Sequence, residues 1–148
     1  MKKLILLTLL FSLFQTNAQN FTRRDSLQGG MRFERSCYDV QRYDLNIKIN
    51  PEERNIVGYN EVTFDILQNT KKIQLDLFEN MNVDSIVFNK QKLTYKRDND
   101  AVFINFNSTL PQNSSQKLRF YYSGKPIIAK RAPWDGGFVF KKDSNGKD

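Results

Sequence analysis

Pairs of carboxylates are the first candidates for chemistry in this sequence. Asp98 and Asp100 are separated by one residue, and Glu52 and Glu53 directly follow Pro51. Two carboxylates can act as general acid and base when they converge on one pocket from separate elements. Each pair here lies within a single short segment rich in turn-forming residues. The sequence therefore favours turns at both places over an acid–base site.

A second cluster of oxygen-bearing side chains lies near the C-terminus. Asp143, Asn145 and Asp148 could supply oxygen ligands to calcium, and Gly146 could supply a flexible backbone position. An EF-hand loop, however, has its glycine at the sixth position, whereas Gly146 is the fourth residue counted from Asp143. A type I′ hairpin turn accounts for the same residues. We therefore predict a turn here in preference to a metal site.

The least ordinary stretch is residues 131–138, which contains the only tryptophan of the chain, Trp134. Pro133 precedes it, and Gly136 and Gly137 follow. The favoured interpretation is an indole packed over a sharp turn, in which the glycines permit positive φ. The alternative is that this segment forms a wall of a binding cleft.

The composition excludes several classes of active site. The chain of 148 residues has no histidine and one cysteine, Cys37. Ser-His-Asp and Cys-His nucleophilic sites and histidine-ligated zinc are therefore impossible within it, as are an internal disulfide and any Cys-x-x-Cys site. Cys37 is interpreted as a small buried apolar residue, with an intermolecular bridge as the alternative.

The charge pattern argues against nucleic-acid binding. The formal net charge is +7, but the basic residues occur as scattered pairs rather than as a block, and no RNA-binding fingerprint is present. Asn-x-Ser/Thr sequons occur at Asn20, Asn107 and Asn113, and they matter only in a host that glycosylates them.

The N-terminus has the pattern of an export signal. Lys2 and Lys3 precede an apolar run at residues 4–14, and Ala18 has the small side chain that a signal peptidase requires. The run is too short for a membrane span, which needs about 20 apolar residues. We predict a signal peptide at 1–18, a periplasmic or extracellular protein, and a polar N-terminal extension at 19–36.

The rest of the chain, residues 37–148, reads as a series of short strands. Apolar residues alternate with polar ones at residues 43–50, 56–67, 73–77 and 118–122, and shorter apolar runs occur at 83–88, 93–95 and 101–106. No window shows a sustained helical repeat. The pattern predicts an all-β fold, an antiparallel sandwich or open barrel. Gly58 suggests a bulge or a close backbone approach.

The C-terminal residues suggest an interrupted hairpin. Residues 137–141 read as a further strand, and the turn at 143–146 is followed by Lys147 and Asp148 alone. Native domains avoid an unpaired strand edge of this kind. We therefore expect the chain to be the N-terminal part of a longer polypeptide, truncated at the C-terminal edge of the domain.

Two sets of motifs in the sequence resemble those of a known family. The first comprises residues 38–45, 56–58 and 73–77. The second and closer one is Tyr122-Ser123-Gly124-Lys125-Pro126 followed by Pro133-Trp134-Asp135-Gly136-Gly137-Phe138. Both sets resemble the aminopeptidase-N-like zinc peptidases. Together with residues 24–29 they are similar to a bacterial exported branch of that family, and the resemblance extends from about Arg23 to the end.

The resemblance implies a saddle-like N-terminal β-domain that packs on a helical thermolysin-like domain of the same polypeptide and helps to wall the substrate cleft. In the full enzyme, Zn²⁺ would activate a water for attack on the N-terminal bond of peptide substrates. The family's H-E-x-x-H and G-x-M-E-N motifs match no position here. We therefore assign no catalytic, cofactor-binding or metal-ligating residue and expect the chain alone to be inactive, with no nucleic-acid partner and no membrane span in the mature protein. The alternative function is a stand-alone secreted β-sandwich that binds a protein or a glycan.

Overall fold

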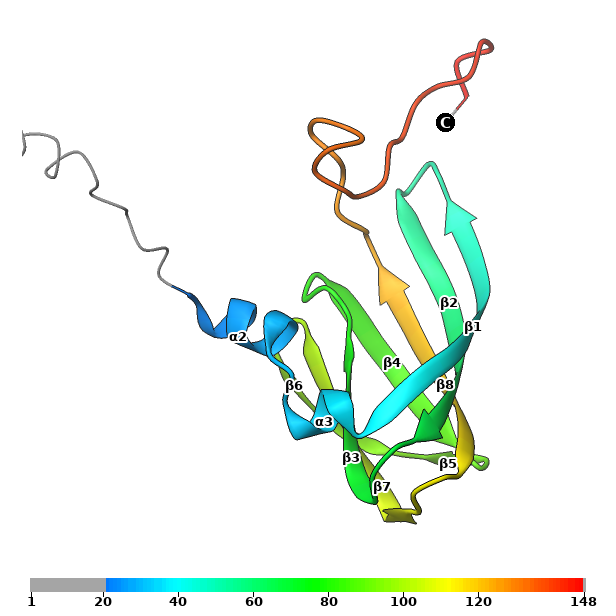
Figure 1. Ribbon diagram of the computed structural model, residues 1–148. Helices are drawn as coiled ribbons and strands as arrows, with labels where there is room; N and C mark the ends of the chain where they lie inside the picture. The colour runs from blue at the N-terminus through cyan, green and yellow to red at the C-terminus, as the bar shows by residue number, and fades with distance from the viewer. Residues whose placement is uncertain (1–20, 148) are drawn as a thin grey trace, which may run out of the picture.

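Two antiparallel sheets pack face to face in the computed structural model, which describes residues 21–147 (Figure 1). The large sheet has the strand order β1-β2-β8-β4-β5, and the small sheet has the order β3-β7-β6. The strands are β1 Tyr38–Asn50, β2 Asn55–Ile66, β3 Thr70–Asp76, β4 Met81–Phe88, β5 Gln91–Lys92, β6 Thr94–Asp98, β7 Ala101–Leu110 and β8 Ser115–Gly124. The predicted all-β class is confirmed, in the form of a sandwich rather than a closed barrel.

The core lies between the two sheets and follows the predicted alternation. Val62, Phe64 and Ile66 on β2 are all at most 1% exposed, and the alternate residues of β8 and β7 are buried with them. Phe64 also makes an edge-to-face contact with Tyr38, with ring centroids 5.7 Å apart. Cys37 is fully buried in the same cluster, as the sequence predicted, and is a free cysteine.

The turns occur where the sequence placed them. Residues 51–54 join β1 to β2, and Asn99 adopts a positive φ of 52° in the turn between β6 and β7. Gly58 meets the predicted close approach, because a Cβ there would lie 2.1 Å from the carbonyl oxygen of Asn46. The bulge of this hairpin lies instead between Val40 and Arg42 on β1.

Two predictions about apolar strands are wrong. The apolar face of β1 is exposed rather than half-buried: the exposed fractions are 55% for Tyr43, 63% for Leu45 and 53% for Ile49. Residues 137–141 form no strand, and only a single bridge joins Phe138 to Ile128 there. Both differences occur where the large sheet extends past the small one, at the upper end of the molecule in Figure 1.

Residues 21–36 are more ordered than the pattern indicated. They contain two short helices, α2 Arg23–Gly29 and α3 Phe33–Ser36. Thr22 and Asp25 form a capping box at the start of α2, a signal that the sequence analysis overlooked. Leu27 is 2% exposed against the small sheet. The predicted signal peptide at 1–18 and the sequon at Asn20 lie outside the described residues.

The buried cluster predicts a clear contrast between two isoleucines. Ile73→Ala should lower the free energy of unfolding by about 2–5 kcal/mol, because a fully buried side chain would leave a cavity between the sheets. Ile49→Ala is the matched control, since Ile49 is 53% exposed, and should cost well under ~1 kcal/mol. Urea unfolding followed by circular dichroism measures both. Equal losses in the two variants would contradict the assignment of the core.

Candidate functional site: a cavity on the large sheet

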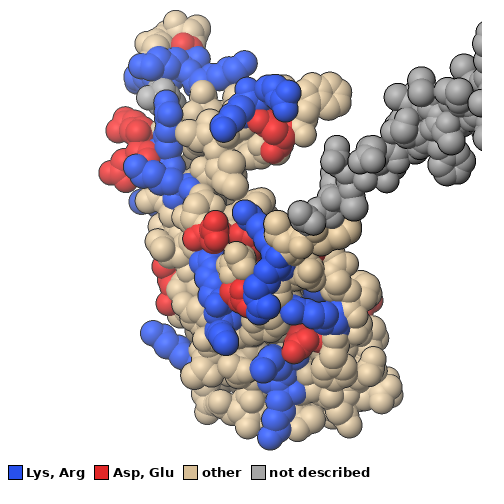
Figure 2. Space-filling view, turned by 90° about the vertical axis from the view of Figure 1, so that its left-hand side faces the viewer, with Lys and Arg blue, Asp and Glu red and all other residues tan. Residues whose placement is uncertain are grey.

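A cavity of about 690 Å³ opens where the large sheet extends past the small one. Its floor consists of side chains of β1, β2 and β8 that share one face of the sheet, because directly paired residues project to the same side. Tyr43 pairs with Val62, and Gly58 pairs with Tyr122. The remaining walls come from β3, from the following residues 77–81 and from the segment after β8. Figure 2 shows the molecule hollowed between the sandwich and its C-terminal segment.

The cavity floor consists mainly of aliphatic and aromatic side chains and contains one amide. Asn60 occupies a position on β2 between Leu45 and Phe120 of the neighbouring strands. Its Oδ1 atom is buried and has no hydrogen-bond partner among the described residues. A buried acceptor without a donor costs free energy, so this amide marks the place where an occupant could add a hydrogen bond.

Polar groups line the wall at β3, and hydrogen bonds hold them in place. The Tyr38 hydroxyl donates to the carbonyl oxygen of Gln74 at 2.5 Å, and Arg35 forms an ion pair with Asp76 at 2.6 Å. Burial raises the pKa of the Tyr38 hydroxyl well above its usual range. Tyr38 is therefore a neutral donor at physiological pH and is not placed to act as a base.

The segment around Trp134 forms the opposite wall. Asp135 Oδ2 accepts the backbone N–H groups of Lys130 and Arg131 at 2.6 and 2.8 Å, and Phe138 N donates to the carbonyl oxygen of Ile127 at 2.8 Å. The hydrogen bonds from Arg131 and Lys130 lower the pKa of the Asp135 carboxyl. The Asp135 carboxylate therefore closes the loop of residues 130–135.

Gly137 is required in this loop for two reasons. Its φ is +103°, and a Cβ would lie 2.6 Å from the carbonyl oxygen of Ile127. The sharp turn that the sequence predicted is present, with Trp134 N donating to Arg131 O at 2.9 Å. The predicted packing of the indole is wrong, since Trp134 is 88% exposed. The alternative is the one that fits, because Asp135, Gly136, Gly137 and Phe138 line the cavity.

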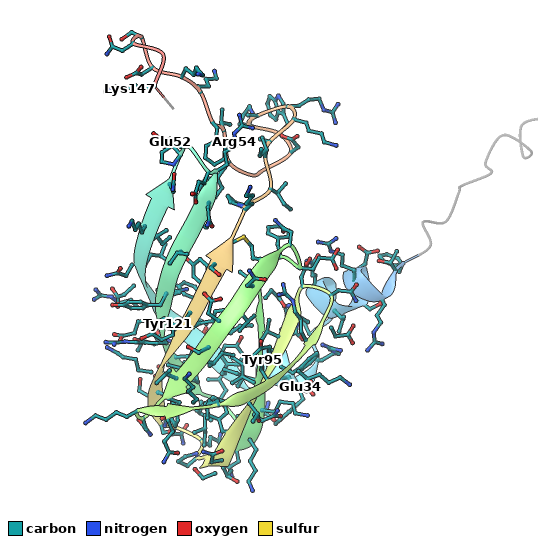
Figure 3. The ribbon with its side chains drawn as sticks, turned by 180° about the vertical axis from the view of Figure 1, so that it is seen from behind. Glu34, Glu52, Arg54, Tyr95, Tyr121 and Lys147 are labelled. Atoms are coloured by element: carbon teal, nitrogen blue, oxygen red, sulfur yellow. The ribbon has the colours of Figure 1, made fainter. Side chains whose placement is uncertain are left out.

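The C-terminal segment also touches the tip of the β1–β2 hairpin. The guanidinium of Arg54 lies 5.8 Å from the centroid of the Phe140 ring. Figure 3 shows Arg54 and Glu52 together at this tip, beside the C-terminal segment and far from Tyr95 on the small sheet. Glu52 and Glu53 are exposed turn residues, as predicted.

The other carboxylates weighed from sequence have structural partners. Asp98 pairs with Arg23, and Asp100 pairs with Arg24 at 2.5 Å while accepting Glu79 N at 2.8 Å. The two carboxylates therefore serve the fold and do not converge on the cavity. Asp143 Oδ1 accepts the N–H groups of Asn145 and Lys147, each at 2.8 Å, so the predicted turn is present. It is not the predicted type I′, because its central residues Ser144 and Asn145 do not have a positive φ.

The arrangement offers a receptor for an apolar group and supplies no reactive centre. Among residues 21–147, no group of three or more His, Cys, Asp or Glu side chains is placed to hold a metal ion. Over the same residues, the helices are too short and too polar to cross a bilayer. The sequence indicated one wall of this cavity, at residues 131–138, but not its floor. Gly58 and Asn60 interrupt the apolar face of β2 and could have indicated the floor.

Comparison with known families decides what this domain is. Residues 40–132, well over half of the 148 residues, match the family described as Peptidase M1 N-terminal domain. The chain belongs to this family. A search of curated protein sequences found no match.

Solved structures of M1 enzymes are similar to the chain. A two-domain M1 zinc metallopeptidase bound to L-arginine is 25% identical, with a TM-score of 0.55, over 65% of this chain and 22% of that one. The M1 zinc metallopeptidase from Deinococcus radiodurans is 26% identical, with a TM-score of 0.54, over 61% of this chain and 21% of that one. Yeast LTA4 hydrolase, at 19% identity and a TM-score of 0.50 over 60% of this chain and 15% of that one, shares the fold. The M1 N-terminal domain thus spans about a fifth of the length of the metallopeptidases it matches.

The unpartnered amide in the cavity of this M1 domain predicts an unusual stabilising substitution. Asn60→Leu should raise the free energy of unfolding by about 1 kcal/mol, because it removes a buried acceptor without a donor and adds apolar contact. Asn46→Leu, on the exposed opposite face of the hairpin, is the control and should change stability by less than ~0.5 kcal/mol. Thermal and urea unfolding measure both. A loss of stability in Asn60→Leu would mean that the amide is satisfied in solution.

Proposed function

We propose that this chain is the N-terminal β-domain of an exported zinc-dependent aminopeptidase that removes N-terminal amino acids from peptides. The proposal rests mainly on the family match over residues 40–132 and is supported by the similarity to M1 zinc metallopeptidases. In this proposal the zinc ion and the catalytic residues belong to a second domain of the same polypeptide. The domain described here helps to bind and position the peptide substrate, and it carries none of the catalytic groups.

The exposed apolar face supports a role within a larger polypeptide. Tyr43, Leu45, Ile47 and Ile49 on β1 continue the face that is buried lower in the sandwich, and their exposed fractions run from 37% to 63%. Contiguous apolar surface of this kind marks an interaction site. Within residues 21–147, β1 has a neighbouring strand on one side only. Further polypeptide of the same protein is the occupant that the family match supports.

Export completes the proposal. It rests on the signal-like pattern of residues 1–18 and on the placement of the free Cys37 in the core, where burial raises the pKa of the thiol and keeps it from reacting. A buried thiol of this kind is compatible with an oxidising compartment.

A stand-alone binding module is the second candidate function. Trp134 is 88% exposed on the rim of the apolar cavity, and exposed indoles of this kind stack on sugar rings and on protein surfaces. The two candidate functions differ in whether the isolated chain binds a glycan or a protein by itself.

Peptidase assays distinguish these functions. A polypeptide that joins this domain to its zinc domain should release amino acids from aminoacyl-coumarin amides, lose this activity with 1,10-phenanthroline and regain it with Zn²⁺. The chain of 148 residues should release none. An inactive longer polypeptide, together with tight glycan or protein binding by the chain that Trp134→Ala abolishes, would favour the binding module.

The exposed apolar face of β1 predicts a substitution whose effect on stability differs between this chain alone and the longer polypeptide. Leu45→Asp should change the unfolding free energy of this chain by less than ~0.5 kcal/mol, since Leu45 is 63% exposed. In the longer polypeptide it should cost about 2 kcal/mol or more, because an unpaired charge would be buried in the interface. Lys48→Asp, on the opposite face of β1, is the control. Equal effects of Leu45→Asp in both lengths would show that this face stays exposed.

A further inference from the structure

A separate layer of structure covers the outer face of the small sheet. We call residues 22–36, which contain α2 and α3, the strap. It lies outside the residues that match the M1 family, which begin at residue 40. Figure 1 shows the strap beside β3 and β6, and Figure 2 looks onto this side of the molecule, where acidic and basic side chains are interleaved.

Ionic contacts rather than apolar packing hold the strap. Leu27 is its one buried side chain among the described residues, while Met31 and Phe33 are 81% and 48% exposed. Leu27 is also not part of the core cluster between the sheets. An element with so little apolar burial is the first to open in a native protein.

Each of its arginines makes a polar contact with the small sheet. Arg23 pairs with Asp98 and Arg24 with Asp100, and both acceptors lie at the turn between β6 and β7. Gln28 adds a hydrogen bond to Asp100 at 2.6 Å. Asp100 is 1% exposed, so the strap neutralises and covers a carboxylate that would otherwise be in contact with water.

The other end of the strap is continuous with the cavity wall. Arg32 donates to Gln74 Oε1 at 2.5 Å, and Gln74 Nε2 donates to the carbonyl oxygen of Leu27 at 3.0 Å. Arg35 pairs with Asp76 at 2.6 Å. Arg35, Gln74 and Asp76 all line the cavity, so the residues that fasten the strap also shape its wall.

We infer that the strap is an ionic latch: it closes over the small sheet through its arginines, and its release opens the wall of the cavity without unfolding the sandwich. The latch is independent of the proposed peptidase function, because it follows from contacts within this chain alone. Salt weakens it, since three of its ion pairs have partly exposed guanidinium groups, with side-chain exposures of 72%, 40% and 29%.

Amide hydrogen exchange reports on the latch. The helical amides of the strap donate within the strap, Gly30 N to the carbonyl oxygen of Ser26 at 3.2 Å and Ser36 N to that of Arg32 at 3.0 Å. These amides exchange with solvent when the strap lifts and its helices unwind, or when the whole domain unfolds. Urea separates the two routes, because local opening depends weakly on urea and global unfolding depends strongly.

The test measures amide exchange of residues 22–36 in the full chain at constant pH. In the wild type these amides should exchange several-fold faster in 0.5 M than in 0.05 M NaCl, with little dependence on urea at low concentration. In the double variant Arg24→Gln/Arg35→Gln they should exchange about tenfold faster at low salt and show a smaller salt effect, because only the Arg23–Asp98 pair remains. Arg42→Gln is the control, because Arg42 pairs with Asp44 within β1 and should behave as wild type.

Two results would overturn the latch. One is amide exchange of the strap that follows the urea dependence of global unfolding in the wild type, which would mean that the strap and the sandwich open together. The other is a salt effect of equal size in wild type and in the double variant. Wild type alone decides the first, so the test does not depend on whether the variant folds.

Discussion

The length mismatch between the two sheets is the constraint on which the rest of this structure depends. A sandwich is stable where both apolar faces are covered, and here the long hairpin of β1 and β2 extends beyond the small sheet. The lower half of the shared face forms the core. The upper half becomes the cavity floor and the exposed stripe on β1. The segment after β8 folds over this excess surface and covers it in part.

The small sheet has the complementary arrangement on its outer face. Gln74 on β3 is 2% exposed and Asp100 in the turn between β6 and β7 is 1% exposed, although both positions would meet water in a two-layer sandwich. The strap is what covers them. Because its contacts are mainly ionic, this third layer is held more weakly than the core. Two of its arginines contact Gln74 and Asp76 on β3, and these two residues also line the cavity. The domain thus has one rigid layer pair and one separable layer.

Membership of the M1 N-terminal domain family gives these surfaces a context. A domain that spans about a fifth of its relatives is expected to present apolar surface to the rest of the polypeptide, and the upper face of the large sheet has that character. Asp98, Asp100 and Asp135 have structural roles in this domain, since each is held by hydrogen bonds or ion pairs within it.

Local patterns in the sequence predict most of the strands, the inward-facing residues of β2, β7 and β8, and the turns, because alternation and turn-forming residues are local signals. Val62, Phe64 and Ile66 are buried as predicted, and the 143–146 segment is a turn. The exclusion of histidine and disulfide chemistry also needed no structure.

Which apolar strand faces are covered depends on how the two sheets and the connecting segments pack together. Tyr43 and Leu45 have the same alternation as buried residues, yet they are exposed because no small-sheet strand lies opposite them in the part of the chain that the structure describes. The exposure of Trp134, the burial of Asp100 and the cavity around Asn60 likewise depend on which segments distant in sequence lie beside these residues. The burial of a side chain depends on segments distant in sequence that pack against it. A local pattern of apolar residues does not contain this information.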